Sequence, residues 1–213
     1  MSGTLLASLV VFGFLLGSLP TGLLVARVFF ATDIRAAGSG NIGAANALRT
    51  LGRGAGALVL VVDALKGFIP ALVGLEFSSV TLAAAAAFAA IVGHCYSPWL
   101  RGRGGKGVAT ALGALFALCW PAALAFIAVW IPIVAASGYA SLGSLTATAL
   151  AAVPLWFFLG ARGAIYGAAV ALLIAWRHRE NVVRLLTGKE NRIQLGRRGV
   201  GPSSQASNPG GLS

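Results

Sequence analysis

Two glycine-rich polar segments interrupt an otherwise apolar chain, and both contain residue types that bind phosphate. The first runs from Gly38 to Gly52, where glycines let backbone N–H groups approach a ligand closely. Its polar side chains can donate hydrogen bonds to phosphate oxygens. They are Ser39, Asn41, Asn46 and Arg49. Because a simple turn would leave these groups unpaired in apolar surroundings, the segment predicts a polar ligand or mutual hydrogen bonds.

The second segment, from Gly93 to Thr110, contains a Gly-Gly-Lys-Gly run that precedes an apolar stretch. This run consists of Gly104, Gly105, Lys106 and Gly107. Exposed N–H groups at a helix N-terminus and a lysine ammonium group can hold an anion. The pattern G-x-x-x-x-G-K-[ST] is absent, so nucleotide hydrolysis gains no support. The alternative is a basic loop that contacts anionic lipid headgroups.

The third segment, from Arg177 to Glu190, follows the last apolar stretch and can continue it as a helix. His178 and Asn181 are three residues apart and would share a helix face. Glu180 and Arg184 can pair at i, i+4. The alternatives are a basic signal that ends a membrane span and, for His178, a hydrogen-bonded histidine at the membrane interface.

The chain lacks the patterns of enzymes that use a protein nucleophile or a metal. Neither of its two histidines has an aspartate four or five residues later, and G-x-S-x-G and carboxylate-rich metal motifs are absent. Cys95 and Cys119 lie in apolar surroundings and are interpreted as packing residues. We therefore expect no metal, no cofactor and no acyl-enzyme, with a substrate that brings its own activated group.

The elements that position these segments are predicted to be membrane helices. Of the 213 residues, 58% are hydrophobic and only 10% are charged, which indicates an integral membrane protein. The net charge of +11 is explained better by cytoplasmic loops rich in Lys and Arg than by nucleic-acid binding. Residues 1–193 are expected to form a single polytopic domain, followed by a flexible cytoplasmic tail at 194–213.

Seven apolar stretches are separated by short breaks. They span residues 5–28, 54–75, 80–98, 107–119, 121–136, 145–160 and 164–176. The fourth and fifth are short, so they are either two spans or one long kinked helix. The first stretch is interpreted as a retained span and not as a signal peptide.

The distribution of basic residues predicts the topology. Fourteen of the sixteen Lys and Arg residues fall in three clusters: Arg27, Arg35, Arg49 and Arg53; Arg101, Arg103 and Lys106; and Arg177, Arg179, Arg184, Lys189, Arg192, Arg197 and Arg198. If these clusters are cytoplasmic, the N-terminus lies outside, the C-terminus is cytoplasmic, and the chain has five or seven spans. We predict seven, because residues 107–176 contain a single charge and leave little room for a water-exposed loop.

One acid and one lysine fall inside the second apolar stretch. Asp63 and Lys66 are three residues apart and would share a helix face. A membrane interior tolerates charges mainly when they pair. We expect a structural ion pair near the floor of the site, in preference to a catalytic role.

The three segments, in this order, resemble the bacterial acyl-phosphate-dependent glycerol-3-phosphate acyltransferases. The resemblance covers residues 1–193 and rests on three motifs: S-G-N-x-G-A-x-N-x-x-R, a Gly-His pair followed by Pro and G-G-K-G-V-A-T, and R-H-R-x-N-x-x-R-L. It implies transfer of an acyl chain from acyl phosphate to the 1-hydroxyl of glycerol 3-phosphate. The products would be 1-acylglycerol 3-phosphate (lysophosphatidic acid) and phosphate, in phospholipid biosynthesis.

The resemblance also implies roles for individual residues. The expected catalytic residues are Ser39, Arg49, Lys106, Ser141, His178 and Asn181, and the expected substrate-binding residues are Asn41, Asn46, Gly104, Gly105 and Gly107. The base that accepts the hydroxyl proton would be a substrate phosphate, with His178 as the alternative. Membrane lipids are expected partners, and the site would face the cytoplasm from the bacterial plasma (inner) membrane. The sequence leaves the oligomeric state open, with a monomer among the options.

Two other classes compete with this interpretation. An organic-anion transporter would use glycine-broken helices and positive charge, but it should show internal repeats and charges near the bilayer midplane. A lipid-binding scaffold would explain the basic loops, yet it would not require polar residues such as Ser39 and His178 in separate segments.

Overall fold

The computed structural model describes residues 3–193, and every regular element in that range is a helix. The elements are α1 (Gly3–Ser18), α2 (Thr21–Phe30), η1 (Ile34–Ala36), α3 (Ala44–Leu51), α4 (Arg53–Leu75), α5 (Val80–Cys95), η2 (Pro98–Leu100), α6 (Val108–Leu118), α7 (Trp120–Ser137), α8 (Ala140–Leu150), α9 (Ala152–Arg177) and α10 (Arg179–Leu186). The predicted tail at 194–213 lies outside the described residues. The all-α prediction is confirmed for the part that is described.

Membrane-spanning length is reached by five helical segments of the described chain. They are Gly3–Phe30, Arg53–Leu75, Val80–Leu100, Trp120–Ser137 and Ala140–Arg177. Helix α6 is apolar but has only 11 residues, shorter than the roughly 20 that cross a bilayer without tilt. Length and composition alone therefore indicate a polytopic membrane protein with five candidate spans.

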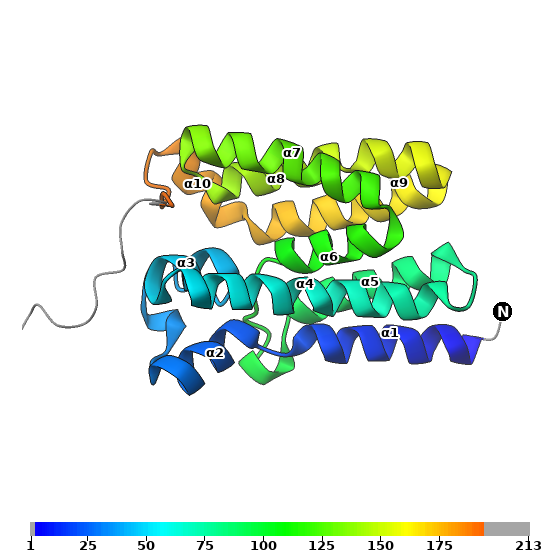
Figure 1. Ribbon diagram of the computed structural model, residues 1–213, viewed down its shortest axis with the longest axis horizontal. Coiled ribbons are helices and arrows are strands. Elements are labelled where there is room, and N and C mark those ends of the chain that lie inside the picture. The colour runs from blue at the N-terminus through cyan, green and yellow to red at the C-terminus, as the bar shows by residue number, and fades with distance from the viewer. Residues whose placement is uncertain (1–2, 194–213) are drawn as a thin grey trace, which may run out of the picture.

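The segment Ala140–Arg177 is two antiparallel legs and not one long helix. At Gly160 the backbone leaves the helical region, with φ 63° and ψ −147°. A Cβ atom on Gly167 would lie 3.1 Å from Cα of Ala152, although 15 residues of continuous helix would separate these positions by about 22 Å. The chain therefore reverses at Gly160, and Figure 1 shows the second leg of α9 returning beside the first.

Helices α6 and α7 are also separate, antiparallel helices. Cys119 breaks the helical path between them, with an extended φ of −161°. Leu112 of α6 and Trp130 of α7 line the same cavity, which requires the chain to fold back at this turn. The sequence left open whether this region forms two helices or one long kinked helix, and the structure has two helices.

Small residues bring α4 and α6 into close contact. A Cβ atom on Gly67 would lie 1.9 Å from the carbonyl oxygen of Thr110, and one on Gly113 would lie 1.8 Å from that of Ala64. Close backbone approach of this kind is how membrane helices associate, since the surrounding lipid is as apolar as the helices. The contact fixes the position of α6, and with it the glycine-rich segment that precedes it, against α4.

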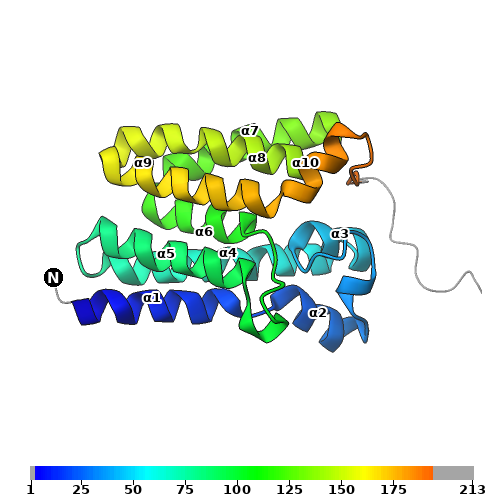
Figure 2. The same ribbon diagram turned by 180° about the vertical axis from the view of Figure 1, so that it is seen from behind.

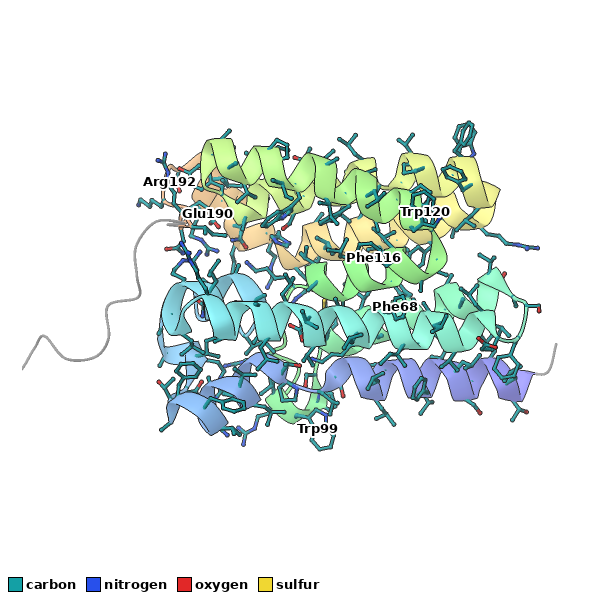
Figure 3. The ribbon with its side chains drawn as sticks, viewed as in Figure 1. Phe68, Trp99, Phe116, Trp120, Glu190 and Arg192 are labelled. Carbon is teal, nitrogen blue, oxygen red and sulfur yellow. The ribbon has the colours of Figure 1, made fainter. Side chains whose placement is uncertain are left out.

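The helices form one bundle with two distinct ends. Helices α3 and α10 lie at one end, and the N-terminus lies at the other, as both views show (Figures 1 and 2). The side chains labelled in Figure 3 mark the same ends, with Glu190 and Arg192 near α10 and Trp120 towards the opposite end. The end that contains α3 and α10 is called the α3 end below.

Candidate active site

A cavity of about 380 Å³ opens within the bundle and brings together side chains from all three polar segments. All six predicted catalytic residues line it: Ser39, Arg49, Lys106, Ser141, His178 and Asn181. Of the predicted substrate-binding residues, Asn41, Asn46 and Gly107 line it, whereas Gly104 and Gly105 do not. Segments more than 130 residues apart in the sequence therefore share one site.

Asn46 organises the loop that precedes α3. Its side chain is 2% exposed, and its Nδ2 donates to the carbonyl oxygens of Ile34, Ala37 and Asn41. Its Oδ1 accepts from the backbone N–H of Ser39 at 2.9 Å. Backbone groups thus occupy the amide, so the polar groups in this segment are partly satisfied by one another.

A glycine is required at the start of this loop. Gly38 has a φ of +61°, and a Cβ atom there would lie 2.2 Å from Oδ1 of Asn46. Asn41 contributes at the other end, where its Oδ1 accepts from the backbone N–H of Gly43, the residue that precedes α3. These contacts shape the loop, and they leave Ser39 exposed where it lines the cavity.

Arg49 supplies one of the positive charges of the cavity. Its Nη1 donates to Oδ1 of Asn46 at 3.3 Å, while its buried Nε has no hydrogen-bond partner among the described residues. Burial lowers the pKa of Arg49, and the nearby Glu190 opposes that shift. A guanidinium group stays charged in proteins, so this donor can bind an anion.

The Gly-Gly-Lys loop is held from two sides. The backbone N–H of Gly104 donates to the carbonyl oxygen of Cys95 at 3.2 Å, and that of Gly105 donates to the carbonyl of His94 at 2.9 Å. On the other side, Arg177 donates to the carbonyl oxygens of Gly104 and Gly105 at 2.9 to 3.1 Å. The predicted anion cradle therefore differs in detail, because the N–H groups of these two glycines bond within the protein.

The first turn of α6, and not Gly104 and Gly105, supplies the free N–H groups of the site. Gly107 precedes α6 with a φ of +81°, and Val108 and Ala109 of the first turn line the cavity. The first N–H groups of a helix lack partners within the helix and carry partial positive charge. An anion in the cavity would meet the N-terminus of α6 beside the ammonium group of Lys106.

Lys106 is joined to the other predicted residues through an acid that the sequence reasoning did not assign to the site. The ammonium group of Lys106 donates to Oδ1 of Asn181. Oε1 of Glu190 accepts from Nδ2 of Asn181 at 2.7 Å and from Oγ of Ser141 at 3.0 Å. Its Oε2 accepts from Nε of Arg184 at 2.9 Å. Glu190 thus holds Ser141 and Asn181 in place. Its one signal in the sequence is that it is an acid within a strongly basic segment.

The chain after α10 closes over the start of α8. Nε of Arg192 donates to the hydroxyl of Tyr139 at 3.2 Å, and the backbone N–H of Ile193 donates to the carbonyl of Gly138 at 2.8 Å. Asn191, between Glu190 and Arg192, lines the cavity. These contacts keep Glu190 against Ser141 and Asn181.

Burial and neighbouring charges shift the pKa values of Lys106 and Glu190. Burial of the ammonium group lowers the pKa of Lys106 to about 8, and the attraction of Glu190 limits the shift. Burial alone would raise the pKa of Glu190, but hydrogen bonds from Asn181, Arg184 and Ser141 together lower it below its ordinary value. At neutral pH, Glu190 is an anion bonded to Arg184, and Lys106 is a cation.

His178 is neutral at pH 7 and has a defined tautomer. Its Nδ1 lies 2.8 Å from the carbonyl oxygen of Ile174, which can only accept, so Nδ1 carries the hydrogen and Nε2 is an acceptor. Burial lowers the pKa of His178 to about 4, and the charge of Lys106 adds to that shift. His178 can therefore accept a hydrogen bond from a hydroxyl group at Nε2.

The predicted pair of Asp63 and Lys66 is confirmed. Their side chains are nearly fully buried, with Nζ of Lys66 2.6 Å from Oδ1 of Asp63. Lys66 also donates to the carbonyl oxygen of Leu19 at 2.5 Å, where the break between α1 and α2 frees a backbone acceptor. Asp63 and the buried His94 both line the cavity. His94 belongs to the Gly-His pair of the second motif, but the sequence assigned it no role in the site.

One wall of the cavity is apolar. Side chains from α4, α6 and α7 form this wall: Leu60, Leu112, Phe126, Ile127, Trp130 and Ile131. The indole N–H of Trp130 donates to Oγ of Ser144 at 3.2 Å, which fixes the ring. The cavity therefore places a surface suited to an alkyl chain beside groups suited to phosphate.

Residues 7–188 match the protein family described as "Glycerol-3-phosphate acyltransferase". The chain belongs to this family. The resemblance is thereby confirmed, and with it the identification as an integral membrane acyltransferase. The polar cavity with its apolar wall is the natural candidate for the active site of this acyltransferase.

Curated relatives and solved structures agree with the family assignment. The glycerol-3-phosphate acyltransferase of Nitrobacter winogradskyi is 44% identical over 85% of this chain and 93% of its own length. That of Roseobacter denitrificans is 45% identical over 86% and 92%. A crystal structure of PlsY (YgiH), an integral membrane glycerol 3-phosphate acyltransferase, in its glycerol 3-phosphate form, matches with a TM-score of 0.83 and 41% identity over 89% of this chain and 96% of that one. The lysophosphatidic acid form of PlsY matches with a TM-score of 0.80.

Proposed function

We propose that this acyltransferase moves an acyl chain from acyl phosphate to the 1-hydroxyl of glycerol 3-phosphate. The products are 1-acylglycerol 3-phosphate and inorganic phosphate, in phospholipid biosynthesis. The observation that carries the proposal is a single cavity that joins Arg49 and Lys106 to an apolar wall. The related PlsY has been crystallised in glycerol 3-phosphate and lysophosphatidic acid forms, which fit the same acceptor and product.

The charges of the cavity support an anionic ligand. Asp63 is paired with Lys66, and Glu190 is paired with Arg184. Among the groups that line the cavity, Arg49 and Lys106 then remain to balance negative charge on a ligand. Both proposed substrates carry phosphate, and the N-terminus of α6 adds further donors for its oxygens.

The choice of acyl phosphate as the donor follows from what the site must do. The sequence has none of the nucleophile motifs of acyl-enzyme chemistry, and an acyl phosphate is a mixed anhydride that is already activated. The protein then needs to position the hydroxyl group, bind the leaving phosphate and stabilise charge on the carbonyl oxygen. Ser39, Ser141 and Asn181 orient the oxygens.

In the proposed step, the 1-hydroxyl oxygen attacks the acyl carbonyl carbon, and the bond from that carbon to the phosphate oxygen breaks. The hydroxyl proton moves to a substrate phosphate, whose second pKa near 6 suits a base at neutral pH. The lowered pKa of His178, about 4, makes it a weaker base than the phosphate, so His178 does not take this proton. Its Nε2 instead accepts a hydrogen bond from the phosphate hydroxyl that the proton transfer creates. Arg49 and Lys106 hold the phosphate as it leaves.

The site is proposed to face the cytoplasm from the bacterial plasma membrane. Length alone indicates five crossings. Two features support two more: α6 is a separate helix from α7, and α9 reverses at Gly160 so that its two legs count separately. With an odd number of crossings, the N-terminus and the α3 end lie on opposite sides of the membrane. The basic clusters favour the cytoplasmic side for the α3 end. All the residues assigned to the reaction line one cavity of a single chain, which is compatible with a monomer.

The decisive experiment uses the purified full-length chain in detergent. We expect phosphate release from acyl phosphate that depends on glycerol 3-phosphate, with 1-acylglycerol 3-phosphate as the product. Lys106→Met should lower the rate about 100-fold or more, because it removes a group that stabilises the leaving phosphate. Arg162→Gln, an exposed residue next to the Gly160 turn, is the matched control and should retain the wild-type rate. Acyl transfer from acyl-CoA, with none from acyl phosphate, would contradict the proposal.

A further inference from the structure

Two buried polar side chains that line the cavity have no task in the proposed acyl transfer. Asp63 is 1% exposed and His94 is 4% exposed, yet both reach the cavity surface. Nδ1 of His94 lies 3.7 Å from Oδ1 of Asp63 and has no hydrogen-bond partner among the described residues. A buried polar atom without a partner destabilises a protein, so the pair marks a place where a polar group of a ligand would be bound.

The loop beside His94 determines which edge of the ring is available. A Cβ atom on Gly105 would lie 2.1 Å from Nε2 of His94, so the loop covers that edge of the ring. The Nδ1 edge is left beside Asp63. Because Gly105 directly precedes Lys106, the pair lies next to the loop that carries a proposed phosphate-binding side chain.

The charge of Asp63 decides what kind of group this place accepts. A carboxylate repels phosphate, so neither phosphate group belongs here. Asp63 forms an ion pair with the buried Lys66, and its carboxylate oxygens can only accept hydrogen bonds. This place therefore suits an uncharged hydrogen-bond donor such as a hydroxyl group.

We propose that Asp63 and His94 together bind the 2-hydroxyl of glycerol 3-phosphate, the hydroxyl that is not acylated. The inference rests on the proposed function, in which Arg49 and Lys106 hold phosphate and the 1-hydroxyl meets the acyl carbon beside the apolar wall. The remaining hydroxyl donates to Asp63 and accepts from the N–H of His94. Asp63 and His94 are thus specificity-determining residues that select acceptors with a hydroxyl at carbon 2.

The test compares two acceptors with acyl phosphate as the donor. Glycerol 3-phosphate has the 2-hydroxyl, whereas 3-hydroxypropyl phosphate lacks it but keeps the phosphate and the primary hydroxyl. We expect the wild type to prefer glycerol 3-phosphate by about 100-fold in kcat/KM, since a site built for a hydroxyl rejects the analogue without it. His94→Phe keeps a ring against Gly105 but removes both nitrogens, and it should lower this preference to about 3-fold or less.

Further variants separate recognition from a general loss of structure. His94→Asn keeps an amide near the position of Nδ1 and should restore part of the preference. The double variant Asp63→Leu with Lys66→Met removes both buried charges together with the acceptor oxygens of Asp63, and it should lower the preference as His94→Phe does. Thr110→Val is the matched control, because its Oγ is also buried without a partner but does not line the cavity. It should keep the wild-type preference.

The outcome that overturns the proposal is an unchanged ratio of the two kcat/KM values in His94→Phe or in the double variant, even where both rates fall. A purely structural role would produce that result, since it would slow both acceptors equally. Failure of the proposed function is distinguishable, because the wild type would then make no product from acyl phosphate and glycerol 3-phosphate.

Discussion

The charge of Lys106 should make the activity depend on pH. Its pKa is lowered to about 8, so the ammonium group is charged at neutral pH and loses its proton as the pH rises through that value. We expect kcat/KM for glycerol 3-phosphate to fall above about pH 8, since this parameter reports ionisations of the free enzyme. Lys106→Arg keeps its charge at alkaline pH and should remove the fall, at a lower rate. A fall that persists unchanged in Lys106→Arg would assign it to another group.

The hydrogen bond from His178 to Ile174 leads to a separate prediction. With a pKa of about 4, His178 does not change charge between pH 5 and pH 8. The acid limb of the pH–rate profile should then reflect the substrate phosphate, whose second pKa is near 6. His178→Ala should lower kcat about 100-fold and leave the acid limb where it is. Loss of that limb in the variant would make His178 the base.

Residue types could be predicted from the sequence, but their partners could not. The chemistry of Ser39 and Arg49 suits a phosphate site, and the family resemblance implies a catalytic role for His178; the structure places all three on one cavity. Glu190 was missed because its role depends on Ser141, 49 positions away. No local pattern encodes a contact of that kind.

At the scale of elements, the loop between α5 and α6 is a clamped support for Lys106. Arg177 on α9 donates to the carbonyls of Gly104 and Gly105 and lies 5.0 Å from the ring centre of Tyr96. A planar guanidinium makes such two-point contacts, and a lysine ammonium does not reproduce them. The loop is thus positioned by a residue that follows the last apolar stretch.

Replacing Arg177 should separate its geometry from its charge. Arg177→Lys keeps the charge but loses the fork, so we expect kcat to fall at least about 10-fold with the alkaline limb unchanged. Arg177→Gln also removes a positive charge that lowers the pKa of Lys106, so the alkaline limb should move to higher pH. Arg179→Lys is the control, because this exposed residue contacts Trp176 and not the loop. Wild-type kcat in Arg177→Lys would rule out the clamp.

The helices themselves were largely predictable, and their ends were not. Apolar stretches mark where the chain is buried in lipid, and five of the seven correspond to one helix or one leg of a helix. The stretch 5–28 instead covers both α1 and α2, and the stretch 145–160 covers the end of α8 and the first leg of α9. Helix α8 nevertheless begins at Ala140, five residues before the predicted stretch, because Ser141 and Ser144 face the cavity and interrupt the apolar pattern. Where polar residues of a site lie in the first turns of a helix, a hydropathy pattern therefore places the start of that helix too late.

At the scale of the whole molecule, function depends on the two ends of the bundle being different. Polar loops, the starts of α3, α6 and α8, and the short helix α10 gather towards one end, where their N–H groups and cations can meet phosphate (Figure 1). The apolar wall extends from there between α4, α6 and α7. A substrate with a charged head and an alkyl chain therefore has one orientation that satisfies both parts.

The proposed seven crossings predict which side of the membrane each turn faces. Cys95 and Cys119 are buried, so both can be replaced by Ala before single cysteines are introduced. Leu142→Cys probes the α7–α8 turn at an exposed side chain, and Ala161→Cys probes the Gly160 turn. In intact cells, an impermeant thiol reagent should label the cysteine at position 161 and leave the one at 142 unlabelled until the membrane is opened.

The same pair of variants separates seven spans from five. A chain with five spans would have two crossings between Lys106 and Arg177 in place of four. The turn at Leu142 would then face the outside of the cell. Labelling of Leu142→Cys from outside would therefore contradict the proposed topology, and it would place Ser141, one residue away, on the opposite side from the basic clusters. Because Ser141 bonds Glu190 at 3.0 Å, that result would conflict with the assembled cavity as well. The location of one turn thus tests the topology and the site together.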